Sequence, residues 1–326
     1  MKAIIRSAYG ASDVVKLVDV DKPAPTHDQL LIKVRAAAVN PLDWHLMRGT
    51  PYLMRVALGI PRPKSPLLGA DFAGTVEGVG SRVARFKLGD EVFGVARGSF
   101  AEYVTVHEAR GVASKPPGIT FEQAAAVPIA GLTALQSLRD KGQVRPGQHV
   151  LIHGASGGVG TFAVQIANSL GAEVAAVCSS RNVDLVRSLG ASYVFDYTKE
   201  DFAAGGRKYD VLLDNVGNRS LSECRLVLKP RGVYVGNGGG GPDDMLWGFS
   251  VIGSMIRSLI LTPFVSQKLR GILANMNHKD LTEMGKFIET GQITPVIDRR
   301  YGLSDVPEAI RYLETSRARG KVIIAM

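Results

Sequence analysis

The sequence predicts an α/β protein with two domains, a mostly β domain and a domain built on a doubly wound parallel sheet. At 326 residues the chain is long enough for two hydrophobic cores. Its first third consists of short β-type runs separated by Gly and Pro, and from about residue 121 strands alternate with helix-length segments. We place the β domain at residues 1–122 and 293–326, as a discontinuous domain, and the parallel-sheet domain at residues 123–292.

The β domain is expected to open with a strand at Met1–Arg6. Short apolar runs bounded by turn residues predict further strands at Leu30–Ala36, Ala73–Gly78, Glu91–Val95 and Ala101–Val106. Strand-like segments return near Pro295–Ile297 and Val322–Ile324, and we assign them to the same domain. A helix around Asp280–Thr290 fits either domain.

The second domain is expected to follow a helical stretch from Phe121 through Leu138. Nearly continuous apolar runs are typical of parallel strands buried on both faces, and they predict strands at His149–His153, Glu173–Cys178, Tyr193–Asp196, Tyr209–Asp214 and Gly232–Gly236. Helical spacing of apolar residues predicts helices at Val159–Leu170, Asn182–Leu189 and Leu221–Leu228.

Composition and charge narrow the functional class. Hydrophobic residues make up 45% of the chain and charged residues 21%, with a formal net charge of +9. The basic residues are scattered, so we expect no nucleic-acid partner. The most apolar stretch, Val251–Phe264, is interrupted by Arg257 and Pro263, so we expect no transmembrane segment. Only Cys178 and Cys224 are present, which favours a reducing compartment, and we expect a cytoplasmic protein.

A glycine loop follows the strand that ends at His153. It reads Gly154-Ala155-Ser156-Gly157-Gly158-Val159-Gly160 and leads directly into a helix. This strand, turn and helix form a dinucleotide-binding motif with Ala155 in place of the first glycine. Gly157 would let a pyrophosphate approach the backbone, and Gly160 would allow close packing of helix and strand.

The same loop also matches the G-x-S-x-G motif of hydrolases through Gly154, Ser156 and Gly158. A hydrolase would need an acid and then a histidine downstream, and Asp214 with His278 would complete that triad. Gly157 and Gly160 serve phosphate binding rather than exposure of a nucleophile. We therefore favour cofactor binding.

The segment after the second strand indicates which cofactor is bound. An NAD enzyme would carry Asp or Glu there for the ribose 2′-hydroxyl, whereas this chain has Ser179-Ser180-Arg181-Asn182. Two hydroxyl donors and a planar cation suit a 2′-phosphate. The segment predicts NADPH as the cofactor, although it is also compatible with an ordinary helix start capped by Ser180 or Asn182.

Several motifs spread over the whole chain resemble the quinone oxidoreductase branch of the medium-chain dehydrogenase/reductase superfamily. Besides the glycine loop they are Ala38-Val39-Asn40-Pro41-Leu42-Asp43, Gly69-Ala70-Asp71-Phe72-Ala73-Gly74, Gly89-Asp90-Glu91-Val92, Ala130-Gly131-Leu132-Thr133-Ala134 and Gly320-Lys321-Val322. Within the branch, Asn40 to Trp44 and Cys178 to Asn182 look most like the chloroplast-envelope quinone oxidoreductase homologues of plants and their bacterial relatives.

The resemblance implies a GroES-like catalytic domain, a Rossmann domain and an active site in the cleft between them. It places Asn40 and Asp43 near nicotinamide and substrate, Thr133 on the nicotinamide side and Tyr197 at the adenosine ribose phosphate. The segments Asn215-Val216-Gly217 and Asn237-Gly238-Gly239 would follow the nicotinamide half of the cofactor. Asn and Gly also favour such turns without any ligand. A homodimer is implied by the resemblance alone.

Zinc enzymes of the same superfamily hold their metal on Cys and His ligands. Here the corresponding Gly-His-Glu segment is Gly69-Ala70-Asp71, and both cysteines lie in the predicted Rossmann domain, so we expect no zinc. Loss of this Lewis acid disfavours alcohol oxidation and favours substrates activated by conjugation.

The expected reaction is hydride transfer from NADPH to a quinone or to the C=C bond of an alkenal or enone. His45 and Tyr52 are candidate proton donors, with Asp43 orienting a water, although solvent can also protonate the product. His45 also fits a packing role, and Tyr52 also fits the edge of a pocket. The apolar segment Met245–Phe264 would wall a pocket for a hydrophobic tail, or belong to the core or a dimer interface. Two alternatives remain, an enoyl-thioester reductase and a non-catalytic NADPH-binding protein.

Overall fold

The computed structural model describes residues 1–237 and 266–326. These residues divide into unit 1, Met1–Leu132 with Asn275–Met326, and unit 2, Thr133–Ala274. These boundaries differ from those predicted from the sequence, which lie after residues 122 and 292. Helix α9 (His278–Glu289) lies in unit 1, where His278 Nδ1 is 2.8 Å from the backbone oxygen of Val112 in strand β7 (Val112–Ser114).

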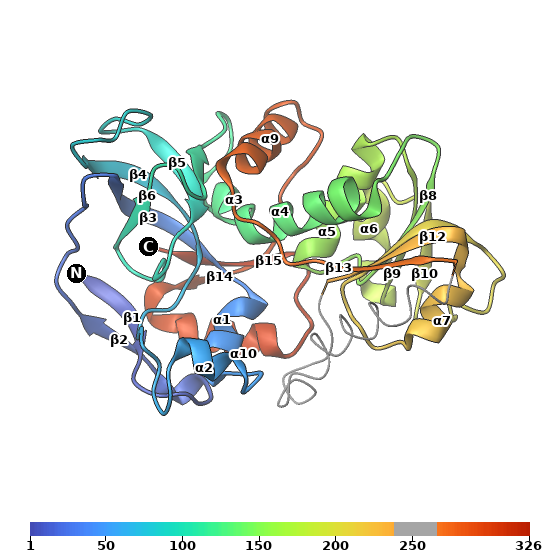
Figure 1. Cartoon of the computed structure of the whole chain (residues 1–326), viewed down its shortest axis with the longest axis horizontal. Coiled ribbons are helices and arrows are strands. Elements are labelled where there is room, and N and C mark those ends of the chain that lie inside the picture. Colours follow the sequence, from blue (N-terminus) through green and yellow to red (C-terminus); the bar gives the residue numbers. More distant parts are fainter. Residues whose placement is uncertain (238–265) are drawn as a thin grey trace. The chain divides into compact units, whose positions relative to one another are not determined.

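Unit 1 is built on a sheet with the order β14-β15-β3-β4-β5-β7, and β6 also pairs with β3 (Figure 1). Apart from β14, which runs parallel to β15, neighbouring strands are antiparallel. The strand bounds are β3 Gln29–Val39, β4 Asp71–Val79, β5 Glu91–Val95, β6 Tyr103–His107, β14 Ile297–Gly302 and β15 Lys321–Ala325. A separate pair is formed by β1 (Lys2–Arg6) and β2 (Val15–Asp19). Because Val322 of β15 pairs with Val39 of β3, the last strand ends up beside the residues that follow β3.

Helix α1 (Pro41–Arg48) begins directly after β3. The backbone N–H of Asn40 donates to Asp43 Oδ2 at 2.7 Å, and Pro41 occupies the first helical turn, where no N–H is needed. Gly49 ends the helix with φ +63°, a left-handed conformation that favours glycine. Helix α2 (Met54–Leu58) follows, and helix α10 (Val306–Glu314) precedes β15.

The helix expected over residues 121–138 is interrupted. The structure has α3 (Phe121–Ala125), α4 (Pro128–Gln136) and a π-type turn over Ser137–Gly142. Pro128 lacks a backbone N–H, so it cannot continue α3 but can begin α4.

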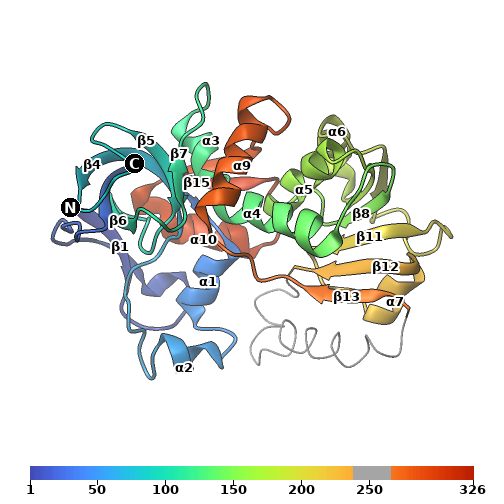
Figure 2. The same ribbon diagram turned by 45° about the horizontal axis from the view of Figure 1, so that its top comes forward.

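The sheet of unit 2 has the order β10-β9-β8-β11-β12-β13, with all described neighbours parallel. Its strands are β8 His149–His153, β9 Glu173–Cys178, β10 Tyr193–Asp196, β11 Tyr209–Asp214, β12 Leu228–Gly236 and β13 Lys268–Gly271. Helices α5 (Gly158–Ser169) and α6 (Val183–Ser188) lie on one side of this sheet and α7 (Leu221–Leu226) on the other (Figure 1, Figure 2). From β8 the chain adds strands β9 and β10 on one side of the sheet, and then adds β11, β12 and β13 on the other side. Open parallel sheets bind ligands at such a switch point, which here lies between β8 and β11. The predicted doubly wound fold is therefore confirmed.

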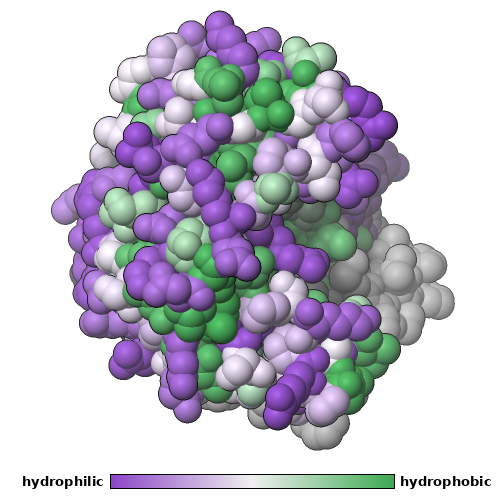
Figure 3. All heavy atoms as spheres, turned by 90° about the vertical axis from the view of Figure 1, so that its left-hand side faces the viewer, coloured by the Kyte–Doolittle hydropathy of each residue, from purple (hydrophilic) through white to green (hydrophobic). Residues whose placement is uncertain are grey.

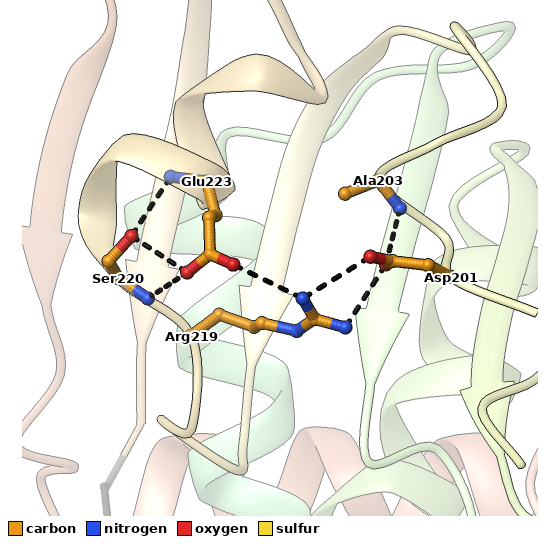
Figure 4. Close-up of polar contacts among 5 residues, drawn as sticks. All are labelled: Asp201, Ala203, Arg219, Ser220 and Glu223. Atoms are coloured by element: carbon orange, nitrogen blue, oxygen red, sulfur yellow. Dashed lines mark hydrogen bonds and ion pairs between the residues drawn. The ribbon is translucent and has the colours of Figure 1, made fainter.

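The start of α7 is fixed by polar contacts on both sides of Arg219 (Figure 4). Arg219 Nη1 lies 3.2 Å from Glu223 Oε1, and its Nη2 lies 3.1 Å from Asp201 Oδ1. Ser220 caps the helix by accepting from the N–H of Glu223 at 3.2 Å, while its own N–H donates to the Glu223 carboxylate. Arg219 also lies 5.4 Å from the ring of Phe202, so this cluster packs against the hydrophobic core of unit 2.

Hydrophilic side chains cover most of the face of the molecule shown in Figure 3, with hydrophobic ones interspersed. Exposed hydrophobic residues of unit 1 include Leu53, Val56 and Ile60 around α2. None of the helices in the described parts of the chain combines the length and the apolar character needed to cross a membrane.

Candidate functional site

The glycine loop connects β8 to α5 at the carboxyl edge of the unit 2 sheet. Gly154 has φ +77°, and a Cβ added to Gly160 would lie 2.2 Å from the carbonyl oxygen of Gly154, so both positions need glycine. A Cβ on Gly157 would meet only the Gly154 oxygen, at 3.6 Å, among the described residues. No side chain caps the start of α5. Backbone N–H groups of Gly158, Val159 and Gly160 thus begin a helix whose entrance suits a phosphate.

Asn182 joins the glycine loop to the end of the next strand. Its Nδ2 donates to Ser156 Oγ at 2.9 Å and to Ser179 Oγ at 3.2 Å. The side chain is 4% exposed, and its Oδ1 has no hydrogen-bond partner among the residues that the structure describes. From the sequence, Asn182 was predicted only as a possible helix cap, because the sequence does not show which way its side chain points.

Ser180 is held by an acid that the sequence analysis did not consider. Its hydroxyl donates to Asp196 Oδ2 at 2.5 Å, and Thr198 Oγ1 donates to Asp196 Oδ1 at 2.7 Å. These hydrogen bonds hold the pKa of Asp196 well below its usual range. An acid at the end of β10 therefore stands beside the segment expected to bind a 2′-phosphate. Arg181 and Tyr197 are exposed next to this cluster.

A second buried cluster lies where β8, β11 and β12 end. His153 Nδ1 is 2.9 Å from Asp214 Oδ1, and Tyr234 Oη donates to Asp214 Oδ2 at 3.1 Å. The backbone N–H groups of Val216 and Gly217 also donate to Asp214 Oδ1, at 3.0 and 2.9 Å. Burial raises the pKa of Asp214, but the hydrogen bonds, with that of His153 the largest, outweigh burial and hold the pKa below its usual value.

The Asp214 cluster fixes the loop Asn215-Val216-Gly217 and, through it, the end of β12. Asn237 Nδ2 donates to Asn215 Oδ1 at 2.9 Å, and the Asn237 N–H donates to the Asp214 carbonyl. Two of the predicted cofactor segments are therefore connected. Gly238, Gly239 and the segment Met245–Phe264 lie outside the described residues.

The hydrolase triad considered from the sequence is not formed in the described structure. The carboxylate of Asp214 is occupied by His153, Tyr234 and two backbone N–H groups. His278 instead contacts the Val112 carbonyl and lies 2.6 Å from Arg85 Nη2. Neither residue has its partner in the proposed triad.

In unit 1, a buried polar cluster surrounds Asn40. Asn40 Nδ2 donates to Asp71 Oδ2 at 2.9 Å, and Lys321 Nζ donates to Asn40 Oδ1 at 2.5 Å. Asp71 Oδ1 accepts from the backbone N–H of Ile129 at 3.0 Å, which ties the start of α4 to the same cluster. Thr133 follows one turn later in α4 and is 7% exposed.

Asp43 and Asp71 are both fully buried in this cluster. The pKa of Asp43 is raised to about 7, chiefly by burial and also by the nearby Asp71, against hydrogen bonding from the Asn40 N–H and attraction by Lys321. Burial also raises the pKa of Asp71, opposed chiefly by Lys321. Asp43 is thus a carboxyl group that changes charge near neutral pH.

The two candidate proton donors differ in their surroundings. His45 Nδ1 lies 3.0 Å from the Thr50 carbonyl oxygen, and since that oxygen can only accept, Nδ1 carries the proton. Burial lowers the pKa of His45, so near neutral pH its Nε2 is an acceptor. Tyr52 is 39% exposed, and its ring lies 4.6 Å from the Arg55 guanidinium. The structure therefore does not present His45 as an acid at neutral pH.

Cys178 and Cys224 are both buried in unit 2, and burial raises the pKa of their thiols to about 11 and about 12. Among the residues with described positions, no group of three or more His, Cys, Asp or Glu side chains is placed to hold a metal ion.

Comparison with known proteins extends over the whole chain. Residues 26–117 match the alcohol dehydrogenase GroES-like domain, and residues 189–324 match the zinc-binding dehydrogenase family. The chain is 36% identical to a 2-methylene-furan-3-one reductase of Solanum lycopersicum and 35% identical to the chloroplastic NADPH-dependent alkenal/one oxidoreductase of Arabidopsis thaliana. Each alignment covers 99% of this chain and 79% of the relative. A chloroplast envelope quinone oxidoreductase homolog of Arabidopsis thaliana is 32% identical, over 99% of this chain and 98% of its own.

Solved structures of quinone oxidoreductases also match the whole chain. A quinone oxidoreductase from Coxiella burnetii superposes with a TM-score of 0.87 and 32% identity, covering 100% of this chain and 99% of that one. The Escherichia coli quinone oxidoreductase complexed with NADPH superposes with a TM-score of 0.83 and 26% identity, covering 100% of both chains.

Proposed function

This chain belongs to the quinone oxidoreductase branch of the medium-chain dehydrogenase/reductase superfamily, and we propose that it transfers hydride from NADPH to quinones or to the C=C bond of alkenals and enones. The family assignment made from the sequence motifs is thereby confirmed. Relatives named as alkenal/one and quinone oxidoreductases support the oxidoreductase class, and the NADPH complex of the Escherichia coli relative supports NADP use.

The observation that carries the proposal is the carboxyl edge of the unit 2 sheet. There Gly157 has an open side at the start of α5, and Asn182 donates to Ser156 of the glycine loop and to Ser179 after the next strand. Such an arrangement suits a dinucleotide pyrophosphate and the adjoining ribose. In this proposal Ala155 to Gly160 hold the pyrophosphate, and Asn215 to Gly217 with Asn237 to Gly239 approach the nicotinamide half.

Preference for NADPH is proposed to depend on Arg181, with Ser179, Ser180 and Tyr197 beside it. A guanidinium supplies both charge and several donors to a phosphate. The proton of Ser180 is directed at Asp196, so Ser180 would have to turn away from that carboxylate to donate to a 2′-phosphate. The charge of Arg181 is therefore the stronger contribution in this proposal.

On the substrate side, we propose that Asn40, Asp43 and Thr133 shape the space next to the nicotinamide. Bound NADPH supplies the hydride, and the chain contributes alignment and exclusion of water. Reduction of an enone leaves an enolate that needs a proton. Because the Nδ1–H of His45 is directed at the Thr50 carbonyl, solvent is the proposed proton source, with Tyr52 at the exposed edge.

The proposal includes no zinc. Its support is the set of available ligands, since the two cysteines are buried thiols in unit 2 and Asp71 is already paired with Asn40 and Lys321. A homodimer and a cytoplasmic location complete the proposal. The first rests on the family resemblance and the second on the unpaired state of both cysteines.

The test is oxidation of NADPH by EDTA-treated protein, followed at 340 nm, with 1,4-benzoquinone, 9,10-phenanthrenequinone, 2-alkenals, enones and crotonyl-CoA. Turnover of free quinones or enones that survives EDTA supports the proposal. Activity confined to crotonyl-CoA would establish an enoyl-thioester reductase instead. Tight NADPH binding without turnover of any compound would establish a non-catalytic binding protein.

A further inference from the structure

Arg6, at the end of β1, is a buried cation with no ion-pair partner among the described residues. Its side chain is 3% exposed, and its Nε and Nη1 are buried with no hydrogen-bond acceptor in the described part of the chain. Arginine is rarely buried unless it is paired, because its charge and its N–H donors lose their hydration. The surroundings of Arg6 therefore lack a group that the side chain requires.

The missing group is an anion. Burial lowers the pKa of Arg6, and the opposing influence comes from the Tyr9 phenol, with no carboxylate contributing within the described structure. Arg48, by contrast, lies 2.5 Å from Glu314, so a paired arginine is available in the same unit for comparison.

The surroundings of Arg6 carry a second positive charge. The Tyr9 ring lies 5.2 Å from the Arg6 guanidinium and 4.5 Å from that of Arg55. Arg55 donates to the carbonyl oxygens of Gly49 and Arg48, both at 2.9 Å, so its own donors are used. Two cations thus share one aromatic ring, and Arg6 is the one whose N–H groups lack acceptors. An anion beside Arg6 would be attracted by both charges.

Tyr9 connects Arg6 to the segment that carries the substrate-side candidates. A Cβ added to Gly49 would lie 2.4 Å from the Tyr9 ring, so this ring packs directly against the backbone after α1. The next residue, Thr50, is 3% exposed, and its Oγ1 is also buried with no hydrogen-bond partner in residues 1–237 and 266–326. The carbonyl of Thr50 contacts His45, and Tyr52 follows two residues later. Unsatisfied donors therefore occur on both sides of the contact between Tyr9 and Gly49.

We propose that Arg6 binds a carboxylate or sulfonate carried by the substrate, so that the preferred electrophile is a conjugated carbonyl compound or quinone bearing a negative charge. This inference rests on the proposed reductase function and deepens it. Oxygen atoms of such a group supply the acceptors that Nε and Nη1 lack, and their charge compensates the guanidinium.

The test compares charged substrates with neutral ones of the same conjugated skeleton, and it compares their ratio between wild type and variants so that intrinsic differences in reactivity cancel. trans-3-Benzoylacrylic acid and its methyl ester share the same enone, and 1,2-naphthoquinone-4-sulfonate is compared with 1,2-naphthoquinone. The measured quantity is the ratio of kcat/KM for the charged compound to that for the neutral one, with NADPH. The variants are Arg6→Met and Arg6→Lys, and the matched control is Arg35→Met, which removes the same charge from an exposed position on β3.

We expect the ratio to exceed one in the wild type and to fall at least about tenfold in Arg6→Met, the loss expected for one charge-assisted hydrogen bond. Arg6→Lys should retain part of the preference, and Arg35→Met should retain all of it. An equal fall of this ratio in Arg6→Met and Arg35→Met would show a general effect of net charge and would contradict an anion site at Arg6.

If Arg6→Met does not fold, the kcat/KM values of the wild type alone still test the anion site. Reduction of the neutral compounds without preference for the charged ones would overturn the anion site and leave the reductase proposal standing. Reduction of none of the compounds would contradict the reductase function and, with it, a substrate site at Arg6. In a separate measurement without NADPH, benzoylacrylate should raise the Tm of the wild type more than its ester does, and the absence of that difference would also count against the site.

Discussion

Lys321 Nζ donates a 2.5 Å hydrogen bond to Oδ1 of Asn40, although the two residues are 281 positions apart. The bond joins the last strand, β15, to the residue that caps α1. Lys321 Nζ also lies 3.4 Å from Asp71 Oδ2, and both side chains are nearly or completely buried. The proposed substrate side of unit 1 therefore depends on the end of the chain for its geometry and its charge balance.

Lys321→Met should destabilise unit 1 strongly. The variant leaves the buried carboxylate of Asp71 without its cation, and breaking a buried pair from one side typically costs about 3–5 kcal/mol. Urea unfolding followed by circular dichroism measures the loss. The double variant Lys321→Met/Asp71→Asn should recover part of it, because the unpaired charge is then gone. A single variant that unfolds like the wild type would contradict the pairing.

Asp43 should make stability depend on pH between about pH 4 and pH 7. Its pKa is raised to about 7 in the folded protein, so the folded state holds a proton that the unfolded state has released. Stability contributed by this group is present at low pH and is lost as the pH rises toward 7, with a slope of at most about 1.4 kcal/mol per pH unit. Asp43→Asn should remove this contribution. Urea unfolding of both proteins at pH 5, 6, 7 and 8 gives the free energy of unfolding at each pH. If this free energy changed with pH equally in both proteins, the raised pKa of Asp43 would be contradicted.

The sequence predicted the regular elements of unit 2 closely, because each buried strand is a continuous apolar run. β8, β9, β10 and β11 have the expected bounds, while β12 begins four residues earlier than predicted. In unit 1, helix α1 was missed although Asn40, Pro41 and Asp43 carry the signals of a helix start. Helix α10 was also missed, despite Pro307 in its first turn.

The polar clusters could not be predicted to the same extent. The glycine loop is a local pattern and could be read directly, whereas the contacts of Asp214 with His153 and Tyr234 depend on which strands are neighbours. Arg6 gave no signal, because one basic residue at the end of a strand looks like a solvent-exposed position. Only its burial in the fold shows that its Nε and Nη1 lack acceptors among the described residues.

Arg181→Ala should shift cofactor preference away from NADPH. Loss of a charged partner of the 2′-phosphate should lower the ratio of NADPH to NADH affinity by about 10- to 100-fold. Titration of both cofactors, followed by quenching of protein fluorescence, gives this ratio. Arg187→Ala, which removes an exposed arginine from α6, is the matched control. An unchanged ratio in Arg181→Ala would remove Arg181 from the phosphate site.

Asn182→Ala should weaken both cofactors to a similar degree. It removes two partly buried hydrogen bonds, to Ser156 and Ser179, that hold the glycine loop against the end of β9. Without them the loop is less preorganised, so both cofactors should bind more weakly by at most about 30-fold, the equivalent of roughly 1 kcal/mol for each bond, with little change in the NADPH to NADH ratio. A change confined to NADPH would instead indicate that Asn182 contacts the 2′-phosphate itself. The same titrations as for Arg181→Ala separate these outcomes.

Two glycines of the loop should respond oppositely to the same added methyl group. At Gly160 a Cβ would lie 2.2 Å from the Gly154 oxygen and 2.7 Å from backbone atoms of Ala155, which cannot move without displacing the loop. Gly160→Ala should therefore lose about 1–3 kcal/mol of stability.

At Gly157 the nearest described atom would be 3.6 Å away and φ is −81°, so Gly157→Ala should fold with nearly unchanged Tm. The added methyl group would occupy the space assigned to the pyrophosphate, so NADPH should bind at least about tenfold more weakly to Gly157→Ala. Thermal unfolding and NADPH titration of both variants test the pair. Wild-type NADPH affinity in Gly157→Ala would exclude this side of the loop as the pyrophosphate site, because nothing else in the described surroundings of Gly157 opposes a side chain there.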